Sequence, residues 1–203
     1  MATWSRTRRI TATQYLERER IAETKSEFDD GEIVAMAGAS PNHNRAAGNI
    51  FAGLHLQLRT SACEPFDSDM RVHVPACDHY YYPDASVACG EASFENVDGV
   101  ESLQNPVLIV EVLSKSTEAR DRGEKLICYQ TLPSLQVYLL VSSDRPLVQI
   151  YERQADDSWR YTVFLDVDHT IELACIGCRL ALADVYARVE FPSPPEGACS
   201  VSG

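Results

Sequence analysis

The sequence predicts a single α/β (α+β) domain in which a central mixed β-sheet is flanked by helices. The chain has 203 residues, of which 45% are hydrophobic, and this is enough for one well-buried core. The nearly unbroken apolar run PVLIVEVLS, at 106–114, is typical of a strand that is covered on both faces. Segments with helical periodicity lie before and after this run, so helices are available to cover the sheet.

The N-terminal part predicts a helix, a hairpin and a second helix. Thr11 or Thr13 can cap a helix through TQYLERERIAE, and KSEF and EIVAMAG then predict two short strands joined by the turn DDG. Ser40 is the expected cap of the second helix, with Pro41 at its first position and an end near Arg59.

The middle of the chain predicts strands, a loop and a third helix. MRVHVPA and HYYYPDASVAC are rich in aromatic and β-branched residues, which favour strands. The polar stretch GEASFENVDGVESLQNP predicts a loop. After the apolar run, Ser116 or Thr117 is expected to cap a helix through EARDRGEKLICYQTLP, which Pro133 ends.

The C-terminal part predicts a hairpin and further strands. LQVYLLVS and PLVQIYER are expected to pair, followed by WRYTVFLD and the short IELACIG. The segment 191–203 has no core-forming content, so we expect residues 1–190 to form the domain and 191–203 a flexible tail.

Composition excludes several classes of protein. No segment approaches the roughly 18 to 20 apolar residues of a membrane span, and the N-terminal residues lack the apolar run of a secretory signal. We therefore expect a cytoplasmic protein without a membrane partner. The net charge of −12 argues against a protein that coats nucleic acid, so any DNA contact must come from a local patch.

The seven cysteines predict reduced, buried thiols. Their number is odd and most lie inside apolar runs, so we expect no disulfides. Cys175 and Cys178 form a lone CxxC without a second pair of ligands at suitable spacing, so no zinc is expected.

Glu111 is the strongest functional clue, because it lies in the middle of the apolar run and should be buried. A buried carboxylate requires a proton, a basic partner or a metal ion. Asp84 offers a second acid, and Pro83 disturbs the strand just before it, so that both side chains can reach a common point. Two carboxylates suit Mg²⁺ (or Mn²⁺), which prefers oxygen ligands.

Lys125 is the expected cation of this site. From Glu111 to Ser114 the strand extends roughly 10 Å, and from Thr117 to Lys125 the following helix extends roughly 12 Å. If this helix packs back along its own strand, Lys125 lies again near the level of Glu111. Asp121, one turn before Lys125, either orients the amine or forms a surface ion pair with it.

Two further residues have open interpretations. Glu32 either adds a carboxylate to the metal or is a solvated residue beside the DDG turn. His43, near the start of the second helix, either contacts a substrate phosphate or the attacking water, or is a satisfied core residue.

Together these motifs resemble a known superfamily. The dipeptide Pro83-Asp84, the strand acid Glu111 and a downstream lysine resemble the PD-(D/E)XK nucleases. The order of DGEIVAMAG, SPNHN, YYPDASV and PVLIVEVLSKSTEARDRGEKLICYQTLP is similar to the Uma-type family of bacterial restriction-endonuclease-like proteins, over about residues 10–185. The superfamily pattern expects lysine at 113, where this chain has leucine, and the resemblance places that amine at Lys125.

The resemblance implies a restriction-endonuclease-like fold and a metal-dependent endonuclease that hydrolyses phosphodiester bonds of DNA. Asp84 and Glu111 would bind Mg²⁺, with the carbonyl of Val112 as a further ligand, and Lys125 would complete the catalytic set. Glu32, His43 and Asp121 would support it. A homodimer is expected by analogy with nucleases that cut two strands. The alternative is a catalytically silent nuclease-fold module that binds DNA or protein.

Overall fold

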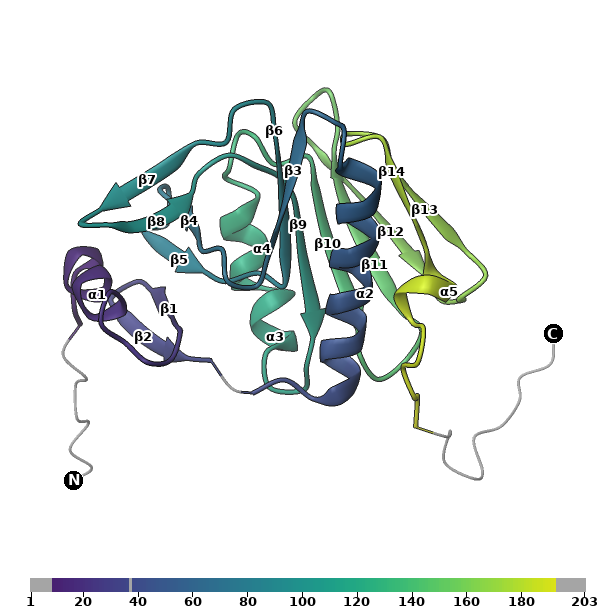
Figure 1. The fold of residues 1–203 in the computed structure, drawn as a ribbon, viewed down its shortest axis with the longest axis horizontal. Coiled ribbons are helices and arrows are strands. Elements are labelled where there is room, and N and C mark those ends of the chain that lie inside the picture. The colour runs from purple at the N-terminus through teal and green to yellow at the C-terminus, as the bar shows by residue number, and fades with distance from the viewer. Residues whose placement is uncertain (1–8, 37, 193–203) are drawn as a thin grey trace.

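The computed structural model describes residues 9–36 and 38–192 (Figure 1). The expected tail at 191–203 therefore lies largely outside the described residues. Five helices are present in this part of the chain: α1 Ala12–Glu19, α2 Pro41–Leu58, α3 Glu118–Asp121, α4 Glu124–Tyr129 and α5 Leu182–Val185. None of them combines the length and the apolar character that crossing a membrane requires.

The central sheet is mixed and has six strands. Its strands are β3 Cys63–Asp67, β6 Ala85–Cys89, β9 Pro106–Leu113, β10 Val137–Ser142, β11 Val148–Arg153 and β12 Trp159–Phe164. Their order is β12-β11-β10-β9-β6-β3, with β9 parallel to β10 and antiparallel to β6. The apolar run therefore forms an inner strand, as its composition predicts.

A second six-stranded sheet carries the N-terminal hairpin. It consists of β1 Ser26–Asp29, β2 Glu32–Ala35, β4 Val72–Val74, β5 His79–Tyr81, β7 Phe94–Val97 and β8 Val100–Leu103, in the order β2-β1-β5-β4-β8-β7. A separate hairpin pairs β13 Thr170–Leu173 with β14 Cys178–Ala181.

Helices cover both faces of the central sheet (Figure 1). One hydrophobic cluster packs α2 onto the sheet and includes Ile50, Leu54 and Val110. A second cluster, on the face toward α4, includes Ile109 and Tyr129. Because successive strand residues point to opposite faces, the side chain of residue 111 lies on the α4 face, between those of 109 and 113. The prediction of a mixed sheet flanked by helices is confirmed.

Two predicted segments differ in the structure. The stretch after Cys89 is not a loop but the hairpin β7–β8, whose Asp98 and Gly99 have φ of 52° and 85°. Asp-Gly with positive φ is a strong signal for a tight hairpin turn, and it outweighs the polar composition of the flanking strands. The helix predicted through 118–133 is interrupted at Gly123, which separates α3 from α4.

The expectation of no disulfides is wrong for two cysteine pairs. Cys63 lies opposite Cys89 in the antiparallel β3–β6 ladder, and the two are bonded. Cys77, in the turn between β4 and β5, is bonded to Cys128 on α4. Both pairs arise from contacts between distant segments, which cysteine spacing does not encode.

Candidate functional site

Glu111 lies on β9 with only 4% of its surface exposed, as its place in the apolar run predicts. Its Oε1 accepts hydrogen bonds from Lys125 Nζ at 3.1 Å and from the Tyr129 hydroxyl at 3.2 Å. Burial raises the pKa of Glu111 well above its usual range; Lys125 lowers it, and the nearby carboxylates of Asp121 and Asp84 raise it further. The site therefore holds more negative charge than its protein cations offset.

Asp84 lies just before β6, at the level of Glu111 on the neighbouring strand β9. The ladder pairs Ala85 with Val110, so the residue before Ala85 reaches the level of Glu111 on the neighbouring strand. Asp84 Oδ2 accepts a 2.6 Å hydrogen bond from the backbone N–H of Val112. Burial raises the pKa of Asp84, while His43 and the Val112 hydrogen bond lower it.

Lys125 is enclosed by three carboxylates. Its ammonium lies 2.8 Å from Glu27 Oε1, 3.1 Å from Glu111 Oε1 and 3.4 Å from Asp121 Oδ1. Burial opposes its charge, but Glu111, Glu27 and Asp121 together raise the pKa of Lys125 well above its usual range. These contacts favour the charged ammonium form of Lys125.

Asp121 is part of this cluster and not a surface residue. It is only 2% exposed, and its Oδ1 has no hydrogen-bond partner within the described residues. The surface ion pair with Lys125, which the sequence left open, does not describe this buried arrangement.

The structure brings His43 to the site but not Glu32. The Ser40 hydroxyl caps α2 by accepting from the backbone N–H of His43, and His43 Nε2 lies 3.4 Å from Asp84 Oδ2. Glu32 is exposed on β2, opposite Asp29 in the hairpin, and makes no hydrogen bond to the cluster among the described residues. The acid that lies near the DDG turn and reaches the cluster is Glu27.

Glu27, Asp29 and Arg120 are site neighbours that sequence reasoning missed. Glu27 is 4% exposed on β1, and besides Lys125 it contacts Arg120 of α3. Arg120 also pairs with Asp29 at 2.7 Å. Positions 27 and 29 lie on one face of a strand because they are two residues apart. Two acids at this spacing are the signal that could have identified them.

The acids of the site keep oxygens that are not used in protein contacts. Within the described residues, Asp84 uses Oδ2 and Glu111 uses Oε1 for the bonds above, and no hydrogen bond reaches Asp84 Oδ1 or Glu111 Oε2. Asp121 Oδ1 is likewise without a hydrogen-bond partner. No three carboxylates of the described chain have ligand oxygens all within 4.8 Å of one another. A hard divalent ion held by these acids would thus need further oxygen ligands, such as water.

The domain is nuclease-like and α+β: a mixed sheet flanked by helices, with Glu111 on β9, Asp84 just before the neighbouring β6, and a buried lysine beside Glu111. The chain belongs to the Uma2 family, whose model is described as "Putative restriction endonuclease" and matches residues 12–183. Family membership and the nuclease-like fold expected from the sequence are thus confirmed.

The chain is also similar to two cyanobacterial proteins in sequence and to one solved structure in fold. The chain is 39% identical over 168 residues to the uncharacterized protein sll1609 of Synechocystis, covering 83% of this chain and 94% of that protein. It is 33% identical over 183 residues to slr1290 of the same organism, covering 90% and 94%. A crystal structure of a putative nuclease from Anabaena variabilis superposes with a TM-score of 0.71 at 19% identity, covering 87% of this chain and 97% of that one.

Proposed function

We propose that this protein is a Mg²⁺-dependent (or Mn²⁺-dependent) endonuclease that hydrolyses phosphodiester bonds of DNA, with Asp84, Glu111 and Lys125 as its catalytic residues. The observation that carries the proposal is the position of Asp84, just before β6, at the level of Glu111 on the neighbouring strand β9. Burial raises the pKa of both acids there, and the nearby carboxylate of Asp121 raises both further. A divalent cation is the natural complement of such a charge excess.

The residues present fit a hard cation. Asp84 and Glu111 would hold it through the oxygens that protein contacts leave unused. The N–H and C=O of a strand residue point to the same side of the strand. The Val112 N–H points toward Asp84, so the Val112 carbonyl does as well, and it is a further candidate ligand. When bound, the ion lowers the pKa of a coordinated water and neutralises charge on the phosphate.

Lys125 would act by charge and position. Its ammonium donates hydrogen bonds to Glu27 and Glu111 and lies 3.4 Å from Asp121 Oδ1. It therefore orients Glu111 in the resting site, and it would meet a phosphate oxygen with the N–H that makes no hydrogen bond among the described residues. A positive charge held at this point stabilises the negative charge that develops on phosphorus oxygens.

His43 would orient Asp84. His43 Nε2 and the Val112 N–H both contact Asp84 Oδ2. The other carboxylate oxygen, Oδ1, therefore points away from these two groups. Asp121 would contribute negative charge without a direct bond to the substrate.

The test uses supercoiled plasmid, the purified full-length chain and Mg²⁺ or Mn²⁺. Asp84→Asn and Glu111→Gln keep the side-chain shape but remove the charge, and each should lower the cleavage rate at least about 100-fold. Glu172→Gln, at an exposed position of β13, is the matched control and should cleave like the wild type.

Isothermal titration calorimetry with Mg²⁺ separates binding from cleavage. Metal binding that both site variants abolish, together with cleavage by the wild type, supports the nuclease. Metal binding without cleavage of DNA or RNA would favour a silent nuclease-fold module. Absence of both activities in the folded wild-type chain would overturn the proposal.

A further inference from the structure

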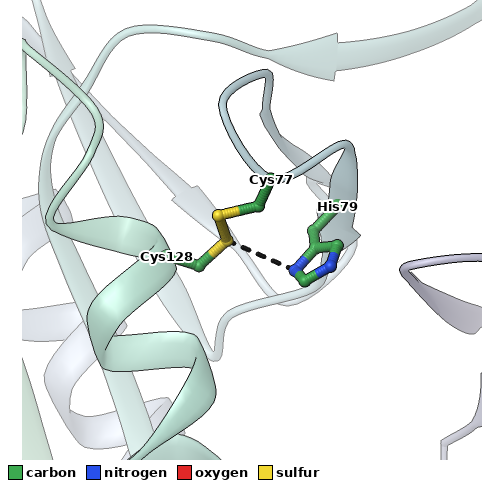
Figure 2. Close-up of side chains that lie close together, drawn as sticks. All are labelled: Cys77, His79 and Cys128. Carbon is green, nitrogen blue, oxygen red and sulfur yellow. Dashed lines mark hydrogen bonds between the residues drawn. A yellow bond between two sulfur atoms is a disulfide. The ribbon is translucent and has the colours of Figure 1, made fainter.

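Two cysteines and a histidine, none of them part of the candidate nuclease site, meet about the β4–β5 turn. Cys77 lies in this turn, His79 begins β5, and Cys128 lies on α4 (Figure 2). Their ligand atoms all lie within 4.8 Å of one another, a convergence that no other group of three such side chains reaches in the described residues. Thiolate sulfur and imidazole nitrogen are the ligands that Zn²⁺ prefers.

The histidine is held as a metal ligand is held. His79 Nε2 lies 2.9 Å from Asp29 Oδ1, and its other nitrogen, Nδ1, faces Cys128 Sγ at 3.3 Å. In zinc proteins a carboxylate on the outer ring nitrogen fixes the tautomer and leaves the inner nitrogen free to bind the ion. Asp29 is itself fixed by Arg120, and the Tyr81 hydroxyl contacts Nδ1, so groups other than the cysteines orient the ring.

The two sulfur atoms are bonded to each other in the structure, with Cα atoms 6.1 Å apart. The disulfide does not account for the histidine beside the two sulfurs, whereas a metal site would use that histidine as a third ligand. A dithiol or phosphine reductant supplies two electrons to this disulfide, and two protons convert it to two thiols. Both thiol protons are then released when a divalent ion binds the two sulfurs.

We propose that Cys77, His79 and Cys128 form a site for a thiophilic divalent metal ion, Zn²⁺ in the first place, that is open when the two cysteines are reduced. Tyr81, whose hydroxyl lies 2.5 Å from His79 Nδ1, gives up that hydrogen bond when the nitrogen binds the ion. Three protein ligands leave the fourth tetrahedral position to water or to the Tyr81 oxygen.

This site is chemically distinct from the proposed magnesium site. It offers soft sulfur ligands, which select Zn²⁺ and Co²⁺ over Mg²⁺, whereas Asp84 and Glu111 offer only oxygen. The two sites are nevertheless linked through one chain of ion pairs, from His79 to Asp29, Arg120, Glu27 and Lys125.

Cobalt spectroscopy on the full chain tests the proposal, because a thiolate bound to Co²⁺ gives a charge-transfer band that carboxylate ligands do not give. The protein is reduced with a phosphine, stripped with a chelator and titrated with Co²⁺. We expect the band to saturate at one ion per chain and to disappear when Zn²⁺ is added. The chain with the Cys77–Cys128 disulfide intact should give no band.

Variants assign the ligands. Cys77→Ser and Cys128→Ser should each abolish the two-thiolate band, and His79→Gln should lower the Co²⁺ affinity at least about tenfold. Cys178→Ser, in the free CxxC pair, is the matched control and should leave the titration unchanged. Asp84→Asn should also leave it unchanged, so the result is independent of the proposed nuclease function.

A measurement on the wild type avoids the risk that a variant misfolds. Alkylation of the reduced chain, mapped by mass spectrometry, should be slowed by Zn²⁺ at Cys77 and Cys128 and not at Cys175 or Cys178. Absence of a thiolate band in the reduced chain, or protection confined to the CxxC pair, would overturn the proposal.

Discussion

Glu27 Oε1 accepts a 2.8 Å hydrogen bond from the ammonium of Lys125, although 98 residues separate the two in the chain. Glu27 belongs to the N-terminal hairpin of the second sheet, and Lys125 to a helix packed on the central sheet. The candidate site is therefore assembled from both sheets, and its ion pairs form only when the two sheets are in contact.

Removal of the Lys125 charge should destabilise the protein strongly. In Lys125→Met, three buried carboxylates lose their shared cation, and breaking a buried ion pair from one side costs about 3 to 5 kcal/mol. Urea unfolding measures this loss. Lys115→Met, at an exposed position, is the control and should change stability by less than about 0.5 kcal/mol. Equal effects of both variants would argue against the buried cluster.

Neutralising Asp121 should weaken metal binding without removing a direct ligand. Asp121→Asn takes one negative charge from the neighbourhood of Asp84 and Glu111, so the affinity for Mg²⁺ should fall about tenfold, as for other groups that support metal ligands. Calorimetry checks this. Glu118→Gln removes a half-exposed acid from the same helix, and an equal loss there would point to a general charge effect.

Loss of the α2 cap should lower stability modestly and disturb His43. The Ser40 hydroxyl accepts from the backbone N–H of His43, and replacing such a cap with alanine costs about 1 kcal/mol. Ser40→Ala should lower the thermal midpoint, whereas Ser40→Asp, which restores an acceptor, should keep it. A midpoint that is equal in all three proteins would show that this cap contributes nothing.

His73 should make the protein less stable in mild acid. Burial lowers the pKa of His73 from its ordinary value of 6.5, Glu95 and Asp78 oppose this, and Arg71 adds to it. The unfolded chain therefore takes up this proton at a higher pH than the folded chain, so the free energy of unfolding falls as the pH drops below about 6.5.

Urea unfolding at several pH values between about 7.5 and 5 measures that slope. His73→Gln should show a shallower decline than the wild type. His55→Gln, on the exposed side of α2, should keep the wild-type slope, and a wild-type slope in His73→Gln as well would contradict the assignment.

Much of the fold follows from local pattern in the sequence. The apolar run around Glu111 predicts an inner strand, and Ser40 with Pro41 predicts the start of α2 at the observed residue. These elements depend on periodicity and capping, which neighbouring residues determine. The β7–β8 hairpin was missed because its strands are polar, although Asp98-Gly99 carried the turn signal.

The site was less accessible to sequence reasoning because its contacts join distant segments. Asp84, Glu111 and Lys125 could be named from burial, a strand bend and element lengths. The spacing of Glu27 and Asp29 placed both acids on one strand face, but nothing within that four-residue strand indicated that Glu27 has a partner on α4. The same holds for Cys77 and Cys128, 51 positions apart.

Glu27 and Asp29 limit how far the chain can be shortened from its N-terminal side. A fragment that begins at Pro41 would retain α2, the whole central sheet, and both Asp84 and Glu111. It would nevertheless leave Arg120 without its two acids and Lys125 without one of three. The segment that bears Asp84, Glu111 and Lys125 should thus be less stable alone than with the N-terminal hairpin, because Arg120 loses both of its ion-pair partners.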